Sequence, residues 1–442
     1  MLDLSSKHVA VFGMGRSGLS AIKFLKMKNC GTISAVNSGL PKTWGEKDKV
    51  FELIGEENCY AQEGSAELFA KTDLIILSPG IPREHEVLKL ALAKNIPVWN
   101  EIELAYQYID SKIPTIAVTG TNGKTTTVTF MGEMIKLCGY EVFVGGNIGV
   151  PLCELLLENR RVDYILLELS SFQLESMPTF HPRVAVILNV YPNHGERYEK
   201  VEDYAKAKFN ISRHMNQSDF LLYPEDIAMI DSWAKGQKAT LVPLRLDKET
   251  CFKDLGKRYD LKEFKLPGAH NIFNLAFASK ALELILEKKE GIQKAINTFP
   301  GVKYRVQYID SNRSFVSYND AKSTNWDATL VAVKSMDKKG RKLSLIIGGQ
   351  KRGRNDSITP SIPELKKYVD RIFLIGETSE MFASELEGHI PYIKAERLER
   401  VIDIMESEKD SGVLLLSPAF PSYDQYPNYE KRGEHFTKLV KG

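Results

Sequence analysis

Short apolar runs alternate with amphipathic stretches from the start of the chain. The opening hundred residues show three apolar runs and one helical pattern, with strands at 8–12, 32–36 and 74–77 and a helix at 19–27. Strands without polar alternation are typical of parallel sheets, because helices cover both faces of such a sheet. The pattern therefore predicts a Rossmann-like α/β unit in this part of the chain.

The same alternation returns twice further along. It predicts central strands at 115–118, 164–167 and 184–188, a helix from about Leu266 to Glu287, and C-terminal strands at 343–347, 371–375 and 413–416. A chain of 442 residues has room for about two to four domains. We predict three α/β domains, at residues 1–104, 105–300 and 301–442, with the first and third Rossmann-like.

Composition narrows the class of protein. With 43% hydrophobic and 26% charged residues the chain reads as globular, and a net charge of +2 is too mild to indicate a nucleic-acid partner. The five cysteines include no C-x-x-C spacing, which disfavours a zinc site or a disulfide framework. No secretory signal pattern and no apolar run of about 20 residues is present. We expect a cytoplasmic monomer that does not insert into membranes.

A glycine turn between a predicted strand and a predicted helix is the strongest chemical signal. Residues 117–127 read AVTGTNGKTTT. Such a turn presents backbone N–H groups and a helix N-terminus to phosphate oxygens, its lysine reaches the terminal phosphates, and a following hydroxyl can bind Mg²⁺. The strict phosphate-loop pattern has a glycine at the position that Val118 occupies here. The alternative to a phosphate loop is therefore a glycine turn followed by Lys-Thr by chance.

This turn predicts a P-loop type of central domain that uses ATP. The expected nucleotide-binding residues are Gly120, Thr121, Asn122, Gly123, Lys124, Thr125 and Thr126, with Thr125 also a Mg²⁺ ligand.

A second glycine motif lies near the N-terminus. Residues 13–18 read GMGRSG after a predicted strand, a pattern shared with dinucleotide sites. Such sites usually carry an acidic residue about 20 positions further on, at the end of the next strand, whereas residues 35–38 read AVNS. We therefore expect a diphosphate ligand other than NAD, for which a UDP-sugar fits, with contacts from Gly15, Arg16, Ser17, Asn37 and Ser38. The alternative is a turn needed only for packing.

Seven motifs follow one another along the chain: 77–82 (LSPGIP), 119–125 (TGTNGKT), 146–149 (GNIG), 168–174 (ELSSFQL), 266–271 (LPGAHN), 318–325 (YNDAKSTN) and 416–433, which begins LSPAFPSYDQY and ends NYEKRG. With these motifs in order, the chain closely resembles the Mur ligase family over nearly its whole length.

The resemblance implies an ATP-dependent amide ligation in peptidoglycan precursor synthesis. The alanine carboxylate of UDP-N-acetylmuramoyl-L-alanine attacks the γ-phosphate to give an acyl phosphate and ADP. The amine of D-glutamate then attacks the acyl carbon and phosphate leaves. Charge on the transferred phosphoryl group requires Mg²⁺ and lysine more than acid–base residues. The first domain would bind the UDP-sugar, the central domain ATP and the third domain the amino acid.

The expected reaction centre combines the phosphate loop with three further residues. Glu168 follows an apolar strand, where a carboxylate can hold Mg²⁺. The resemblance assigns His194 to a second Mg²⁺ and Lys208 to a carbamate formed with CO₂, although the residues alone suggest a structural histidine and a solvated lysine. The predicted catalytic residues are Lys124, Glu168, His194 and Lys208, and the predicted ligands of two Mg²⁺ ions are Thr125, Glu168, His194 and Lys208.

The resemblance also supplies the remaining contacts. It places Asn271 and Asn274 near adenine, and Arg305 and Asp320 at the third-domain side of the nucleotide. Contacts to the UDP-sugar are expected from Ser78, Gly80, Asn147 and Ser170, and contacts to D-glutamate from Lys322, Thr324, Arg352, Ser422, Tyr423 and Tyr429. Arg352 offers a bidentate contact to a carboxylate. Each polar residue could instead be a helix cap or a turn residue.

Two alternatives and three departures accompany this interpretation. The chain could be a Mur ligase for a different amino acid, although it lacks the Asp-Asn-Pro-Arg tetrapeptide usual in the diaminopimelate- or lysine-adding members. It could be a non-catalytic nucleotide-binding regulator, which predicts loss of the charged residues that are present here. The departures are Phe420-Pro421 and Tyr429, which bear on the amino-acid site, and Asn37, which stands where many members carry an acidic residue near uracil.

Overall fold

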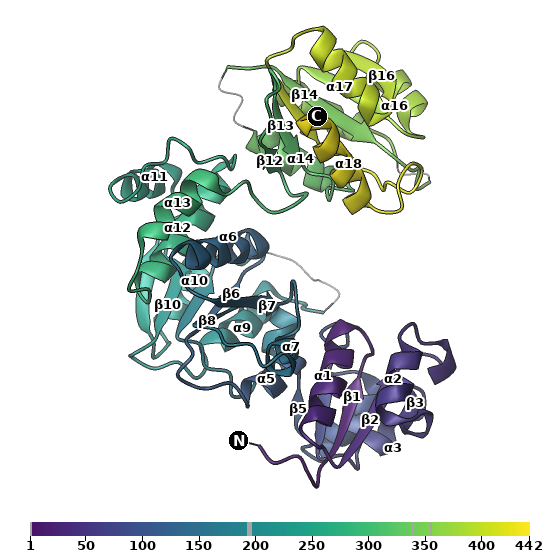
Figure 1. Ribbon diagram of the computed structural model, residues 1–442, viewed down its shortest axis with the longest axis vertical. Helices are drawn as coiled ribbons and strands as arrows, with labels where there is room; N and C mark the ends of the chain where they lie inside the picture. The colour runs from purple at the N-terminus through teal and green to yellow at the C-terminus, as the bar shows by residue number, and fades with distance from the viewer. Residues whose placement is uncertain (1, 192–196, 337–339, 354–355) are drawn as a thin grey trace. The chain divides into compact units, whose positions relative to one another are not determined.

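A computed structural model of the chain describes residues 2–191, 197–336, 340–353 and 356–442 (Figure 1). Three sheets are present in this part of the chain, and every strand pairing is parallel except the pairing of β12 with β13. This confirms the predicted three-part α/β fold class.

The first sheet has the order β3-β2-β1-β4-β5, with β1 at His8–Phe12, β2 at Thr32–Asn37, β3 at Cys59–Ala61, β4 at Leu74–Leu77 and β5 at Val98–Trp99. The second has the order β11-β10-β9-β6-β8-β7, with β6 at Thr115–Thr119, β7 at Val142–Gly146, β8 at Tyr164–Glu168, β9 at Val184–Ile187, β10 at Phe220–Pro224 and β11 at Thr240–Leu244. The third has the order β12-β13-β17-β14-β15-β16, with β12 at Gln307–Ile309, β13 at Val316–Asn319, β14 at Leu343–Gly348, β15 at Arg371–Ile375, β16 at Tyr392–Glu396 and β17 at Val413–Leu416.

Helices connect the strands. Those before residue 200 are α1 (Arg16–Met27), α2 (Lys47–Ile54), α3 (Ala66–Phe69), α4 (Lys89–Ala93), α5 (Glu101–Tyr106), α6 (Lys124–Leu137), α7 (Leu152–Leu157) and α8 (Ser171–Leu174). Those after it are α9 (Val201–Phe209), α10 (Ala228–Ala234), α11 (Lys248–Gly256), α12 (Ala269–Glu283), α13 (Glu290–Thr298), α14 (Trp326–Ser335), α15 (Ile362–Tyr368), α16 (Ser379–Leu386), α17 (Leu398–Ser407) and α18 (Tyr429–Lys441). The helix predicted from about Leu266 to Glu287 is the shorter α12.

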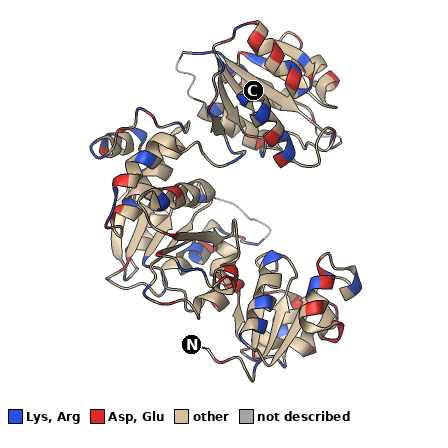
Figure 2. Cartoon of the chain, in the orientation of Figure 1, with Lys and Arg blue, Asp and Glu red and all other residues tan. Residues whose placement is uncertain are grey.

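Burial explains the apolar strands. Along β14, Leu345 and Ile347 pack in one hydrophobic cluster while Ile346 packs in another, so both faces of the third sheet are covered. Along β1, Val9 and Val11 likewise belong to a different cluster from Ala10 and Phe12. Charged residues lie mainly on the helices and loops, and the strands are largely free of them (Figure 2). Within the described residues no helix has the length and apolar content needed to span a membrane.

The chain forms two compact units. Unit 1 comprises residues 1–251 and 274–292 and contains the first two sheets, whereas unit 2 comprises residues 252–273 and 293–442 and contains the third. The chain therefore passes between the units three times, and α12 contributes residues to both. The predicted domain boundary at 104 falls within α5 and that at 300 follows α13. Both boundaries stay predictions.

Candidate active site

The glycine turn joins β6 to the start of α6 in unit 1. Gly123 is the N-cap of α6 with φ of +86°, and a Cβ there would lie 2.5 Å from Oδ1 of Asn274. The positive φ favours glycine here, and the close approach of the Asn274 amide adds to that preference. The Lys124 ammonium donates to the carbonyl oxygens of Gly120 (2.8 Å) and Thr121 (2.9 Å), so it lies over its own loop. Thr125 and Thr126 follow in the first turn of α6, where N–H groups are available to an anion.

Asn189, which was not among the predicted site residues, shapes this loop. Its Oδ1 accepts from the backbone N–H of Thr121 (3.1 Å) and of Asn122 (2.9 Å), and its Nδ2 donates to the Asn122 carbonyl (3.1 Å). Asn189 follows β9, the neighbour of β6 in the sheet. The only sequence signal for Asn189 was its position as a polar residue just after an apolar strand. The order of strands in the sheet is what shows that it lies beside the phosphate loop.

A cavity of about 320 Å³ brings predicted residues together in unit 1. It is lined by Pro79, Gly80, Lys124, Asn147, Ser170, Ser171, Phe172, Tyr204 and Lys208. Five of these were predicted from the sequence, and they come from loops that follow β4, β7 and β8 and from helices α6 and α9. The structure therefore joins residues of the proposed UDP-sugar, ATP and carbamate groups at one cavity.

Glu168 ends β8 beside this cavity. Its side chain is buried, and Oε1 accepts from Nδ2 of Asn147 at 3.0 Å. Oε2 is also buried and has no hydrogen-bond donor among the described residues. A buried carboxylate oxygen without a partner is unfavourable, and a cation would satisfy it. The described residues hold no cluster of three or more His, Cys, Asp or Glu side chains suited to a metal, and His194 lies outside the described residues.

Lys208 lies on α9 with only 1% of its surface exposed. Its Nζ donates to the Gly120 carbonyl at 3.0 Å and lies 4.2 Å from the centre of the Tyr204 ring. Burial, and then the nearby charge of Lys124, lower the pKa of Lys208 to about 6. The amine is therefore largely neutral near pH 7, which is the nucleophilic form.

Ser170 caps helix α8, which is one of the two roles expected for it. Its hydroxyl accepts from the N–H of Gln173 at 3.2 Å, and the Gln173 side chain accepts from the Ser170 N–H at 2.9 Å. This is a capping box at the start of α8. The cap fixes the turn that presents Ser170 and Ser171 to the cavity.

The predicted UDP-sugar residues of the first sheet follow β1, β2 and β4, which are adjacent. Gly15 and Arg16 are exposed at the start of α1, with Ser17 half-buried beside them. Asn37 accepts from the Met14 N–H at 3.4 Å. Ser38 is exposed just after β2. Because the strands are parallel, these loops lie at one edge of the sheet, where α/β folds bind ligands.

Packing accounts for part of this glycine motif. A Cβ on Gly18 would lie 1.9 Å from the Gly13 carbonyl oxygen, whereas a Cβ on Gly15 would meet nothing within 4 Å. Ser78 donates to that same Gly13 carbonyl at 2.9 Å. Close packing therefore explains the glycines at positions 13 and 18. Packing does not explain Gly15.

The predicted amino-acid residues belong to unit 2. Lys322 and Thr324 follow β13, Arg352 follows β14, Ser422 and Tyr423 follow β17, and Tyr429 begins α18. Arg352 donates to the Thr324 carbonyl, and its guanidinium lies 5.5 Å from the centre of the Phe420 ring. The Lys322 Nζ lies 5.8 Å from the centre of the Tyr429 ring. The Ser422 hydroxyl is buried without a partner among the described residues, whereas Tyr423 is 64% exposed.

The remaining nucleotide residues are divided between the units. Asn274 of unit 1 packs against Gly123, as described above. Asn271 belongs to unit 2, where its Nδ2 donates to the Pro267 carbonyl at 2.7 Å. Asp320 is buried in unit 2 and accepts from the Val306 N–H (3.1 Å) and the Ser417 hydroxyl (2.7 Å). Burial raises the pKa of Asp320 to about 6, and Arg305 is exposed on the neighbouring loop.

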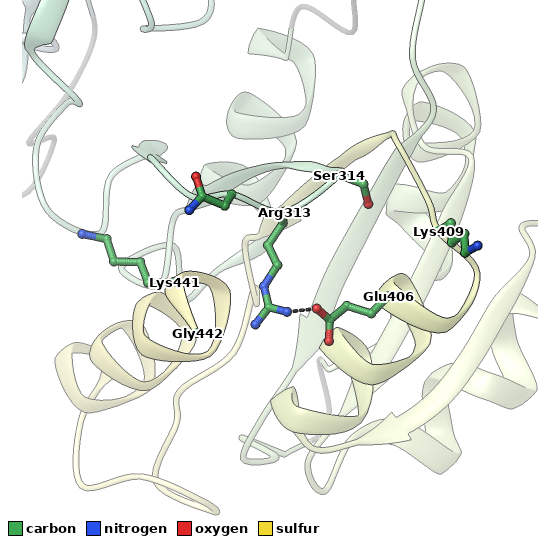
Figure 3. A pocket seen from close by; sticks show the side chains of 7 residues that line it. Arg313, Ser314, Glu406, Lys409, Lys441 and Gly442 are labelled. Atoms are coloured by element: carbon green, nitrogen blue, oxygen red, sulfur yellow. Dashed lines mark ion pairs between the residues drawn. The ribbon is translucent and has the colours of Figure 1, made fainter.

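Another cavity, of about 540 Å³, lies in unit 2 at the end of α18 (Figure 3). Its described lining contains none of the predicted site residues and consists of Asn312, Arg313, Ser314, Glu406, Lys409, Lys441 and Gly442. Arg313 forms an ion pair with Glu406 and donates to the carbonyls of Leu439 (2.8 Å) and Val440 (3.1 Å). The Arg313 guanidinium is therefore already paired with Glu406 and with the carbonyls at the C-terminal end of α18. This argues against an anion-binding site in this cavity.

Comparison with known proteins gives the family. Residues 118–282 match the Mur ligase middle domain, and residues 7–100 match the N-terminal domain described as Mur ligase MurD-like. The chain is 34% identical over 457 residues to UDP-N-acetylmuramoylalanine--D-glutamate ligase of Geotalea daltonii, covering 100% of this chain and 98% of the relative. It is 35% identical over 459 residues to the enzyme of that name from Caldicellulosiruptor bescii, covering 99% and 98%. The chain belongs to the Mur ligase family.

Solved structures agree on the fold. The MurF ligase of Thermotoga maritima, determined in complex with ADP, aligns with a TM-score of 0.54 at 15% identity and covers 100% of this chain and 99% of that one. The UDP-N-acetylmuramate-alanine ligase MurC of Thermotoga maritima aligns with a TM-score of 0.54 at 17% identity and covers 98% of each chain. At these identities the likeness concerns the fold alone.

Proposed function

We propose that this protein is an ATP-dependent ligase that joins D-glutamate to UDP-N-acetylmuramoyl-L-alanine in peptidoglycan precursor synthesis. The carrying observation is the full-length similarity to relatives named for that reaction. The cavity in unit 1 supports the proposal, because it combines the phosphate-loop lysine, a buried second lysine and the asparagine that contacts Glu168.

The first step activates the alanine carboxylate. Its oxygen attacks the γ-phosphate of ATP, the bond to the β-phosphate oxygen breaks, and an acyl phosphate and ADP result. Lys124 leaves the carbonyls of its loop to contact the phosphates and offsets their charge. The N-terminus of α6 and the loop held by Asn189 bind the remaining phosphate oxygens.

Three oxygen donors of this chain fit Mg²⁺. They are the unpartnered Oε2 of Glu168, the hydroxyl of Thr125 and, in the proposed modified form, a carbamate on Lys208. Carboxylate-type and hydroxyl oxygens are the ligands that Mg²⁺ prefers. A bound Mg²⁺ supplies charge neutralisation at the transferred phosphoryl group.

The carbamate follows from the state of Lys208. The neutral amine attacks the carbon of CO₂, an N–C bond forms, and the nitrogen loses a proton. The product carries a negative charge, which a bound Mg²⁺ would offset. Burial supports the attack on CO₂ because it disfavours the ammonium form and so leaves the amine neutral.

The second step forms the amide. The amine of D-glutamate attacks the acyl carbon, the C–O bond to phosphate breaks, and the amine loses its proton to solvent or to released phosphate. The two carboxylates of D-glutamate require cations and polar groups, which Lys322, Arg352 and Ser422 supply in unit 2.

The test is product formation with a choice of amino acids. Purified protein, Mg²⁺, ATP and UDP-N-acetylmuramoyl-L-alanine are incubated in parallel with D-glutamate, L-glutamate, L-lysine or meso-diaminopimelate, and phosphate release and product mass are measured. We expect turnover and the mass of the D-glutamyl amide with D-glutamate only. Turnover with another amino acid overturns the specificity, and no turnover with any of them overturns the ligase proposal.

A further inference from the structure

Arg432 is a buried cation that the proposed reaction leaves without a role. It lies in the first turns of α18 with 1% of its surface exposed, and it is among the largest fully buried side chains of the described residues. In the described part of the chain it forms no ion pair, and Asp424 and Tyr426 act on its charge only through longer-range electrostatics. A buried guanidinium without an ion pair is costly, so its position calls for an explanation.

The guanidinium donates to one carbonyl in each of three loops. Its Nη2 donates to Phe420 (2.8 Å) and Ala321 (3.4 Å), and its Nη1 donates to Gly348 (3.3 Å). These carbonyls follow or end β17, β13 and β14, three adjacent strands of the third sheet. The planar fork of arginine can reach several acceptors in fixed directions, which a lysine ammonium on one flexible stem cannot do equally.

Each of these loops carries a predicted contact to the amino acid. Ala321 precedes Lys322, Gly348 lies four residues before Arg352, and Phe420 lies two residues before Ser422. The Phe420 ring is also the partner of the Arg352 guanidinium at 5.5 Å. A shift of any one loop would therefore move one of the predicted amino-acid contacts, Lys322, Arg352 or Ser422, relative to the other two.

Backbone contacts already link the loops in pairs. The Ala419 N–H donates to the Ser323 carbonyl (3.0 Å), and the Gln350 N–H donates to the Pro421 carbonyl (2.9 Å). Gly349 has φ of +148° and a Cβ there would lie 2.1 Å from the Pro421 carbonyl oxygen and 3.2 Å from Nη1 of Arg432. The loops thus pack closely around the guanidinium, and the pairwise links remain when Arg432 is changed.

We infer that Arg432 is a positioning residue for the amino-acid site, holding the loops that carry Lys322, Arg352 and Ser422 in one fixed arrangement. The inference rests on the proposed function for the identity of the substrate, but the ordering of the loops does not depend on it. Positioning of this kind affects binding and alignment of the amino acid without affecting the phosphate loop, which belongs to unit 1.

The test compares Arg432→Met and Arg432→Lys with a matched control, Arg313→Met. Arg313 also donates to backbone carbonyls in unit 2, but to those at the C-terminal end of α18 (Figure 3), whereas Arg432 lies near the start of that helix. We expect Arg432→Met to raise the KM for D-glutamate at least tenfold while the KM values for ATP and the UDP-sugar change less than twofold. Arg432→Lys should recover part of the loss, and Arg313→Met should keep the parent KM for D-glutamate.

Hydrogen exchange of the full-length protein gives a readout that is independent of activity. We expect faster amide exchange in Arg432→Met confined to residues 321–325, 348–353 and 420–423, with the smaller change in Arg432→Lys. Unchanged exchange in these loops, or equal rises in all three KM values, overturns the positioning role. Altered exchange in a protein that makes no amide with D-glutamate would overturn the proposed substrate and leave the positioning role standing. If Arg432→Met does not fold, the KM values and the amide exchange of Arg432→Lys are used instead to test the positioning role.

Discussion

Lys206 and Lys208 lie two residues apart on α9 and have opposite surroundings. Lys206 is exposed, whereas Lys208 is buried against Tyr204 and the Gly120 carbonyl. The helical repeat turns the second lysine toward the sheet and the first toward solvent. The buried Lys208 amine borders the cavity and burial lowers its pKa, so it is the candidate for carbamate formation.

A rescue experiment tests this difference between the two lysines. We expect Lys208→Ala to lower ligase activity at least a hundredfold, because it would remove the proposed anionic ligand for Mg²⁺, and added formate or acetate to restore part of it. Lys206→Ala should keep activity within twofold of the parent. Loss of activity in Lys208→Ala without any rescue by small carboxylates would contradict the carbamate. The measurement is phosphate release over a series of carboxylate concentrations.

At this scale the sequence identified residues that line the cavity more readily than residues that hold the surrounding loops in place. Lys124, Asn147, Ser170 and Lys208 were predicted and do line one cavity. Asn189 and Arg432 were not assigned roles, since their contacts are with backbone groups far away in sequence. A side chain that binds the backbone leaves no paired residue type in the sequence to reveal it.

Among the secondary-structure elements, interior strands were predictable and edge strands were not. The predicted strands correspond to β1, β2, β4, β6, β8, β9, β14, β15 and β17, all of which lie inside their sheets. The strands at the sheet edges, β3, β5, β7, β11, β12 and β16, were missed. Edge strands have one unpaired side and less burial, so their sequences are shorter or more polar. Two interior strands were also missed: β10 ends in a proline, and β13 reads VSYN.

The contact between α5 and α7 contains a carboxyl group that should make stability depend on pH. Glu101, the first residue of α5, is buried and accepts from the Cys153 N–H at 2.5 Å in the first turn of α7. Burial raises the pKa of Glu101 to about 7, above its ordinary value of 4.5. The folded protein therefore binds more protons than the unfolded chain between these values, and this contribution to stability is lost as pH rises through about 7.

Glu101→Gln keeps the acceptor oxygen and removes the charge. We expect the free energy of unfolding of this variant to match that of the parent protein near pH 5 and to exceed it at pH 8. The difference between the two proteins should grow by at most about 1.4 kcal/mol per pH unit. Urea unfolding at both pH values measures this. Glu158→Gln, at the exposed end of α7, is the control and should follow the parent at both. An equal gain at pH 5 and pH 8 would contradict the assignment.

For the whole molecule, nucleotide binding should appear as stabilisation. A ligand that binds only the folded state adds about 2.7 kcal/mol to the free energy of unfolding at a concentration of 100 times its Kd. We expect a non-hydrolysable ATP analogue with Mg²⁺ to produce an increase of this size. Lys124→Ala should lose most of it at the same concentration, because the ammonium no longer contacts the phosphates. Denaturant unfolding with and without the analogue measures the effect, and equal stabilisation of the parent and variant would exclude Lys124 from the nucleotide site.

The repeated passage of the chain between its two units has a consequence for the order of synthesis. Unit 1 takes residues 274–292 from beyond a segment that belongs to unit 2. These residues include Asn274, which packs against Gly123, and Gly291, which packs against Leu137 and Cys138. A nascent chain that has reached residue 251 therefore lacks the residue that packs against Gly123 of the phosphate loop. The ribosome must extend the chain to about residue 292, well into the sequence of the second unit, before the first can close its fold.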